Sequence, residues 1–99
     1  MIVFNRTAEI ARGKMAEALP WAHKIAGIWE EVTGVSVTVM TPVGGKPFQI
    51  VWTANYDGLG AYEEATGKAV SNEAYVAEIT SAADLFIEGS VQDSIWQTS

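Results

Sequence analysis

Only a few side chains of this 99-residue chain could carry acid-base chemistry. His23 is the only histidine, and it is therefore the only side chain whose unperturbed pKa lies close to neutrality. On a helical wheel it falls with Arg12 and Glu30, away from the apolar stripe. This position favours a surface or salt-bridged histidine over a general base. A lone histidine without a carboxylate-rich helix face beside it predicts no metal site.

The other polar patterns fit structural roles. The acid pairs Glu30-Glu31 and Glu63-Glu64 are sequence neighbours, which point about 100° apart on a helix, so neither forms an acid-base couple. The glycines at 58–60 and 44–45 lack the Lys-Ser/Thr of a phosphate loop and fit a helix entry and a hairpin turn. No Gly-x-Ser-x-Gly elbow accompanies the serines. The sequence gives no support to nucleophilic catalysis or nucleotide binding.

Aromatic residues are the strongest remaining signal, with four Trp, three Tyr and three Phe. Trp29 lies on the apolar stripe of a predicted helix, Trp52 on the helix-facing side of a predicted strand, and Trp21 at the edge of the stripe. These rings could simply fill the core. Alternatively, they could line a pocket between sheet and helices that takes a flat apolar ligand with a few polar contacts. The candidate pocket residues are Asn5, His23, Trp29, Trp52 and Tyr62.

Composition and charge narrow the class of protein. The chain is 48% hydrophobic and 18% charged, has no cysteine and carries a net charge of −6. Its length is that of one domain, residues 1–99. The negative charge, concentrated in residues 50–99, opposes nucleic acid and anionic membranes as partners. Without cysteine, disulfides and thiolate chemistry are excluded. The sequence has no signal peptide, so we expect a cytoplasmic location.

Hydrophobic periodicity predicts the elements that must position these residues. Spacings of three and four indicate a long helix that ends at Gly34, with a kink or restart at Pro20. Asp57 and Ser71 are the expected N-caps of two later helices, which Gly67 separates or bends. The βαββαβ order predicts a ferredoxin-like α+β fold, a four-stranded antiparallel sheet with helices on one face. Strands are expected at 2–8, 35–41, 48–56 and 90–97, and helices at 12–33, 59–69 and 72–85.

Alternation along the strands divides the predicted sheet into two faces. The helix-facing set is apolar except for Arg6 and Asp93. Because the first and last strands of this topology are antiparallel neighbours, we expect these two residues to form an ion pair. The set comprises Ile2, Phe4, Arg6, Val35, Val37, Val39, Phe48, Ile50, Trp52, Ala54, Tyr56, Val91, Asp93 and Ile95.

The opposite face of the sheet carries no charged residue. A sheet face left in water usually carries Lys and Glu, so a face of hydroxyls, amides and a few apolar residues indicates burial with satisfied hydrogen bonds. The chain offers no second helix layer, so we expect a homodimer joined through its sheet faces. The alternative is a monomer with a wetted polar face. The dimer-facing residues are Val3, Thr38, Val51, Thr53 and Trp96.

The chain resembles the dimeric α/β-barrel superfamily, in which two ferredoxin-like protomers face their sheets together. Within it, the segment from Ala82 to Trp96 and the long helix rich in Ala and Trp are similar to small bacterial NIPSNAP-like proteins. This resemblance covers nearly the whole chain. It implies the fold and the homodimer, and NIPSNAP-like members mostly have no assigned reaction.

The same superfamily includes antibiotic-biosynthesis-type and haem-degrading monooxygenases, which work without a conventional flavin or separate metal prosthetic group. The resemblance implies a first-strand Asn, matched by Asn5, and a Trp near the second helix, to which the haem-degrading enzymes add a His. Residues 59–85 contain neither Trp nor His, only Tyr62 and Tyr75, and alternation turns Asn5 away from the helices. Haem degradation is therefore not expected, and no cofactor is assigned.

Three functions stay open at this point. The first is a NIPSNAP-like homodimer that binds a small apolar ligand or has a structural role. The second is a cofactor-independent monooxygenase or isomerase acting on an aromatic or polyketide-like compound, with Asn5 and a tyrosine as polar groups. The third is a subunit that regulates or scaffolds another protein through its acidic second half. An enzyme requires a cavity with convergent polar groups, whereas a pure assembly module would pack Trp29 and Trp52 closely.

Overall fold

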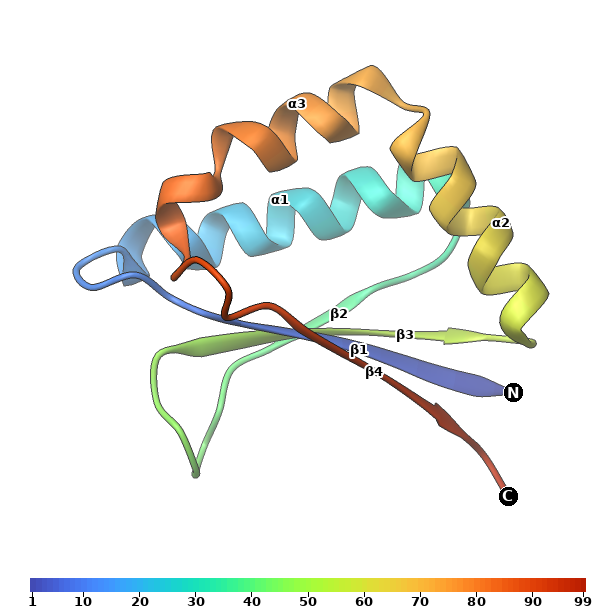
Figure 1. Cartoon of the computed structure of the whole chain (residues 1–99), viewed down its shortest axis with the longest axis horizontal. Helices are drawn as coiled ribbons and strands as arrows, with labels where there is room; N and C mark the ends of the chain where they lie inside the picture. The colour runs from blue at the N-terminus through green and yellow to red at the C-terminus, as the bar shows by residue number, and fades with distance from the viewer.

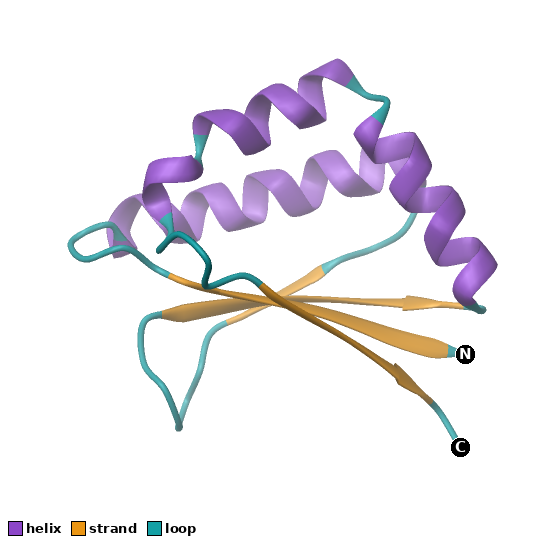
Figure 2. Ribbon diagram, in the orientation of Figure 1, coloured by secondary structure: helices purple, strands orange, loops and turns teal.

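Four antiparallel strands form one sheet, and helices cover only one of its faces (Figures 1 and 2). The computed structural model describes residues 1–99. The strand order is β2-β3-β1-β4, so the predicted ferredoxin-like α+β fold is confirmed. The elements are β1 (Ile2–Glu9), α1 (Met15–Thr33), β2 (Thr38–Met40), β3 (Gln49–Tyr56), α2 (Leu59–Val70), α3 (Glu73–Ser81), the 3-10 turn η1 (Ala83–Leu85) and β4 (Gln92–Gln97).

Strand β1 lies inside the sheet and pairs along its whole length with β3, from Ile2 opposite Tyr56 to Glu9 opposite Gln49. On its other side it pairs with β4, where Arg6 stands opposite Asp93. The predicted pairing of these two charges is confirmed by two hydrogen bonds between their side chains. Register is fixed here because a slip by one residue would turn the apolar set of β1 toward the uncovered face.

Helix α1 packs its small residues on the sheet, and Ala18, Ala22, Ile25 and Ala26 are buried. It ends as expected at Gly34, which adopts a left-handed conformation with φ 77° and donates its N–H to a carbonyl of the last turn. It begins three residues later than predicted, because residues 12–13 form a turn in which Gly13 has φ 79°. The helix is continuous through Pro20, so the restart considered for that position does not occur.

The edge strand β2 is shorter than the strand predicted over 35–41. The N–H of Val35 is bonded to the hydroxyl of Thr33 at 3.1 Å rather than to a neighbouring strand. Val35 and Val37 still pack against the core, as the face count predicted.

The prediction that Phe48 lies on the helix-facing side of the sheet is wrong. Phe48 precedes β3 with φ 57° and is exposed, because a left-handed residue breaks the alternation of the strand.

Three predictions about the second pair of helices are wrong. Asp57 does not cap α2, whose N-cap is Gly58 in an extended conformation without a side-chain bond. Gly67 does not separate the helices, since α2 runs through it to Val70. Ser71 does not cap α3 either. Its hydroxyl donates to the Gly67 carbonyl, while Asn72 is the N-cap and accepts the Tyr75 N–H at 2.9 Å.

Replacement of the cap tests this assignment. Asn72→Ala is expected to lower the free energy of unfolding by about 1 kcal/mol, because one N–H of the first turn of α3 loses its acceptor. Ser71→Ala, the matched control one residue earlier, is expected to change it by less than about 0.5 kcal/mol. Urea unfolding of both variants at equal protein concentration measures the difference. A larger loss for Ser71→Ala would contradict the assignment of Asn72.

The core between sheet and helices is built largely from alanine. Of the 13 buried residues, eight are Ala. Four buried residues form one cluster around Ile2 and Tyr56, and four form another around Ile10 and Ile50. Small core residues leave room that the half-buried aromatic side chains around them fill only in part. None of the helices is long and apolar enough to cross a bilayer.

Candidate functional site

A cavity of about 860 Å³ lies between the helix-facing side of the sheet and the helices. It receives side chains from β1, α1, β3, α2 and α3 and from the segment 82–91, and 19 of its 25 lining residues are hydrophobic. Its volume falls in the range of small-molecule pockets, about 300–1,000 Å³. Helix α3 makes this space possible, because it packs on α1 and α2 rather than on the sheet (Figure 1).

Aromatic rings form two groups along the cavity. Trp21, Trp52 and Phe86 meet edge to face, with ring centroids 5.6–6.3 Å apart. The Trp52 indole N–H donates to the Ala22 carbonyl at 3.1 Å, and the Trp21 N–H donates to Glu78 at 3.0 Å. These bonds join α1 to β3 and to α3 and hold the first group rigidly.

The second aromatic group contains all three tyrosines of the chain. Tyr62 stacks on Phe4 at 5.0 Å and meets Tyr56 edge to face at 5.4 Å, and Trp29 meets Tyr75 at 5.5 Å. The rings come from α1, α2, α3 and two strands, so this end of the cavity is the place where the helical layer and the sheet converge.

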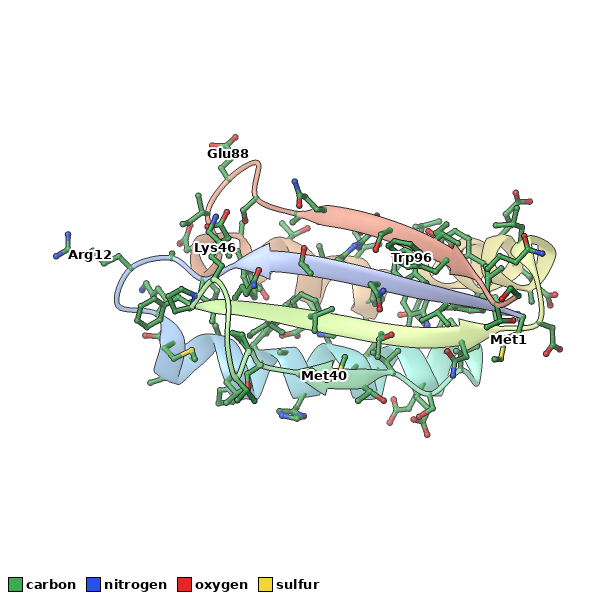
Figure 3. All side chains as sticks on the ribbon, turned by 90° about the horizontal axis from the view of Figure 1, so that it is seen from below. Met1, Arg12, Met40, Lys46, Glu88 and Trp96 are labelled. Carbon is green, nitrogen blue, oxygen red and sulfur yellow. The ribbon has the colours of Figure 1, made fainter.

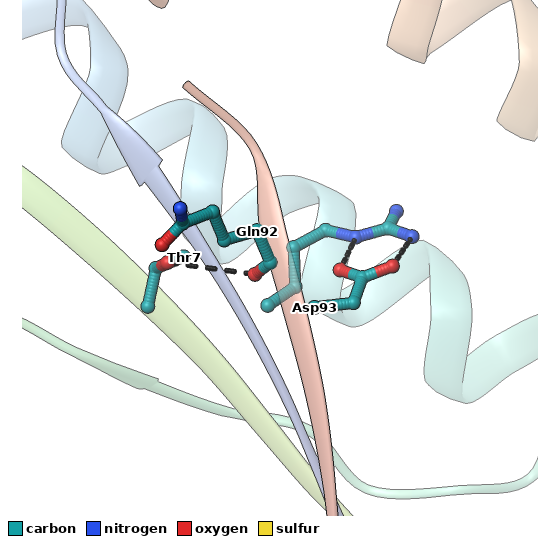
Figure 4. Close-up of polar contacts among 4 residues, drawn as sticks. Thr7, Gln92 and Asp93 are labelled. Atoms are coloured by element: carbon teal, nitrogen blue, oxygen red, sulfur yellow. Dashed lines mark hydrogen bonds and ion pairs between the residues drawn. The ribbon is translucent and has the colours of Figure 1, made fainter. Parts of the chain in front are cut away.

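The Arg6–Asp93 ion pair lies beside the tyrosines. Nε and Nη2 of Arg6 donate to the two carboxylate oxygens at 2.7 and 2.9 Å, and the same strand pair carries a bond from the Thr7 hydroxyl to the Gln92 carbonyl (Figure 4). The guanidinium also lies 5.7 Å from the centre of the Phe4 ring. The hydrogen bond to Asp93 raises the pKa of Arg6. Arg6 lines the cavity, and it is the only basic residue that does.

Two enclosed polar atoms of the cavity wall have no hydrogen-bond partner, Trp29 Nε1 and Thr66 Oγ1. Trp29 differs in this from the other three tryptophans, whose indole N–H groups all have acceptors. Thr66 differs from the helical hydroxyls of Thr33 and Thr80, which donate to the carbonyl four residues back. Buried polar groups without partners are rare in folded proteins and cluster where ligands or water act.

Burial raises the pKa values of Tyr56 and Tyr75 above the ordinary value for tyrosine. For Tyr56 this effect is opposed by the neighbouring indole N–H of Trp29, a contact that falls short of hydrogen-bond geometry. For Tyr75 it is opposed by the positive charge of Arg6. Both hydroxyls are therefore protonated near neutral pH and available as donors.

A pH dependence of stability follows from these two residues. Because their folded-state pKa values lie above the unperturbed 10.0, the folded chain holds both protons more tightly than the unfolded chain. The stabilisation is complete below pH 10 and is lost as the pH rises through the folded-state values. We expect the urea midpoint to fall as the pH rises above 10, and to fall less in the double variant Tyr56→Phe/Tyr75→Phe. Parallel pH profiles would contradict this.

The structure brings three of the five candidate pocket residues together. Trp29, Trp52 and Tyr62 line the cavity. Asn5 and His23 do not: Asn5 lies in β1 on the face away from the helices, as alternation predicted, and His23 is exposed on the outer side of α1. The arrangement contains no group of three His, Cys, Asp or Glu residues suited to a metal ion.

Sequence reasoning missed Arg6, Thr66 and Tyr75 as wall residues. For Arg6 the signal existed, since alternation already placed this charge among the apolar residues of the helix-facing set. For Tyr75 the signal was the N-cap at Asn72, which sets the phase of α3. Thr66 gave none, because a threonine in a helix ordinarily bonds its own backbone.

No protein-family model and no curated protein matches the sequence. The fold, in contrast, matches solved structures over the whole chain. A NIPSNAP family protein from Agrobacterium tumefaciens has a TM-score of 0.85 over 99% of this chain and 92% of its own, at 23% identity. A NIPSNAP domain protein from Burkholderia xenovorans has a TM-score of 0.85 over 100% and 95%, at 18% identity. The chain has a NIPSNAP-like fold.

The NIPSNAP-like fold confirms the expected resemblance, and it extends to a second group of proteins at lower similarity. A candidate antibiotic biosynthesis monooxygenase from Deinococcus radiodurans has a TM-score of 0.73 over 100% of this chain and 93% of its own, at 15% identity. At these identities the likeness shows a shared fold and leaves the function to be argued from the cavity.

Proposed function

We propose that this NIPSNAP-like protein binds a small, mainly apolar molecule in the cavity between its sheet and its helices. The volume of about 860 Å³, with its aromatic walls, carries this proposal. A pure assembly module would have Trp29 and Trp52 packed into a filled core, whereas both border the open space. The tyrosine hydroxyls and Arg6 on the same wall add polar groups of the kind that fix the orientation of a ligand.

The test uses the bicyclic hydrocarbon tetralin as the probe. Titration into the labelled protein, followed by methyl NMR, is expected to shift signals of wall residues such as Ile25, Ile79 and Val91. The signals of Val43, which is fully exposed in the hairpin loop, are expected to stay in place. Saturable shifts confined to the wall would support the proposal. No saturable shift at the wall would overturn it.

Two substitutions on one helix provide a matched control for tetralin binding. Ile79 and Val76 both lie on α3 and are similarly exposed, at 40% and 45%, but only Ile79 lines the cavity. Ile79→Trp places a large ring at the cavity wall and is expected to weaken tetralin binding at least about tenfold, the effect of 1.4 kcal/mol. Val76→Trp is expected to leave it unchanged. Equal effects of the two variants would place the binding elsewhere.

A homodimer joined through the sheet faces is the second part of the proposal, with residues 1–99 as one domain. Apart from Glu9 at the end of β1, which pairs with Lys46, the strands carry no charged residue on the uncovered face, and Trp96 and Met40 lie on it with 66% and 43% of their surfaces exposed. Figure 3 shows both on the sheet as seen from below, while Arg12, Lys46 and Glu88 lie in loops toward one end. Large apolar side chains in an uncharged exposed patch are typical of a protein interface.

The monooxygenase or isomerase alternative has one observation in its favour, the fold shared with the candidate monooxygenase from Deinococcus radiodurans. In this chain Asn5 does not reach the cavity, so a reaction there would depend on the tyrosines and Arg6.

A cytoplasmic location also belongs to the proposal. A chain without cysteine needs no oxidising compartment, and cell fractionation tests the location.

A further inference from the structure

Three tyrosine hydroxyls of the cavity wall have no protein partner, and they favour one class of ligand. Tyr56, Tyr62 and Tyr75 all line the cavity, and none of their hydroxyls takes part in the side-chain hydrogen bonds of the structure. They are also not among the fully enclosed unpartnered atoms. Even Tyr56, with 4% of its surface exposed, therefore keeps some accessible surface on its hydroxyl.

The groups around these hydroxyls favour one orientation of their protons. The Trp29 indole N–H, which is a donor only, lies next to Tyr56 and favours its oxygen in the anionic form. Arg6, also a donor only, acts in the same way on Tyr75. Lone pairs turn toward such donors and positive charge, which leaves the two hydroxyl protons free for an acceptor on a ligand. At its tyrosines the wall therefore presents donors, whereas its carboxylate acceptors come from Asp84 and Glu88.

The charge of the wall argues against an anionic ligand. Arg6 is the only basic lining residue, and its Nε and Nη2 are already bonded to Asp93. The other charged lining residues, Asp84 and Glu88, are acids. A carboxylate moved from water into this space would lose its hydration without gaining an unpaired cation, which is costly. A neutral oxygen acceptor meets the donors without that cost.

We infer that the ligand of this cavity is a neutral, largely apolar carbonyl compound whose oxygen accepts hydrogen bonds from the tyrosine hydroxyls. This inference rests on the proposed ligand-binding function and narrows it to a class of compound. The apolar body of the ligand packs against Trp21, Trp52 and Phe86, and its oxygen lies at the tyrosine end of the cavity.

The experiment compares tetralin with 1-tetralone, which has the same skeleton with one CH₂ replaced by C=O. Calorimetric titration is expected to show 1-tetralone binding about tenfold more tightly, the gain of one good hydrogen bond. Tyr56→Phe, Tyr62→Phe and Tyr75→Phe keep the rings and remove one hydroxyl each. At least one of them is expected to reduce the preference for the ketone several-fold while tetralin binding is retained.

The control variant is Thr80→Val, which removes a hydroxyl of α3 that lies outside the cavity wall and bonds to the Val76 carbonyl. It is expected to leave both affinities unchanged. Equal binding of the two probes, or a ketone preference that survives in all three Phe variants, would overturn the inference while ligand binding stands. Tighter binding of tetralin-1-carboxylate than of 1-tetralone would overturn its neutral character. If no probe binds, the proposed function fails and the inference fails with it.

Discussion

Val51→Lys is expected to convert the proposed homodimer into a monomer. Val51 lies on β3, on the uncovered face, and pairs in register with Thr7 and Met40 of the neighbouring strands. In a dimer joined through this face each copy would bury a new ammonium group, and each buried charge costs several kcal/mol. The dimer dissociation constant is therefore expected to rise at least about a hundredfold.

Sedimentation equilibrium measures this change directly. The unmodified protein is expected at about twice the 10.7 kDa of one chain at micromolar concentration, and the variant at 10.7 kDa. Ala74→Lys is the control, since it adds the same charge at an exposed position of α3 on the helical side. Circular dichroism checks that both variants remain folded. A mass of 10.7 kDa for the unmodified protein would rule out the sheet-to-sheet dimer.

Ile50→Ala is expected to give the largest loss of stability of any single truncation in the core. Ile50 is the largest fully buried side chain, at 0% exposure, and it packs with Ile10, Ala18 and Ala22. Removing three carbons from such a site costs about 2–5 kcal/mol. Small domains are stable by only about 5–15 kcal/mol in total, so much of the stability would be lost.

Urea unfolding at a fixed protein concentration is the measurement, because the proposed dimerisation would make the apparent stability depend on concentration. Val43→Ala removes two carbons from a fully exposed side chain in the hairpin loop and is expected to change stability by less than about 0.5 kcal/mol. A loss below about 1 kcal/mol for Ile50→Ala would mean that the cavity next to this cluster lets the core collapse around the deletion.

The sheet was predictable because successive side chains of a strand alternate between its two faces, so the sequence shows which residues share a face. Alternation placed Arg6 and Asp93 on the same face, and the topology brought them together as the ion pair. Errors occurred where a local bond overrides the pattern. The Thr33 hydroxyl takes the N–H of Val35, and Asn72 rather than Ser71 accepts from the first turn of α3, a choice that side-chain type alone does not decide.

The cavity itself was less predictable than the fold. The rings of Trp29, Trp52 and Tyr62 marked its walls correctly, but whether aromatic side chains fill a space or border it depends on the distance between the layers. That distance is set by the buried alanines and by the packing of α3 on helices. Alternation along β1 had already placed Asn5 on the face away from the cavity. His23 was included among the candidate pocket residues although its position on the helix gave no reason to expect it there.

The edges of the sheet govern how copies of this chain can associate. A long, regular edge is a template on which strands add without limit, which leads to fibrous polymers. Here β2 offers only three residues at one edge, and β4 at the other carries Asp93, a charge on the side facing the helices that is held by Arg6. The addition of strands from other copies at either edge of the sheet is therefore unfavourable. Association through the broad face instead closes after two copies, because the same patch is used by both.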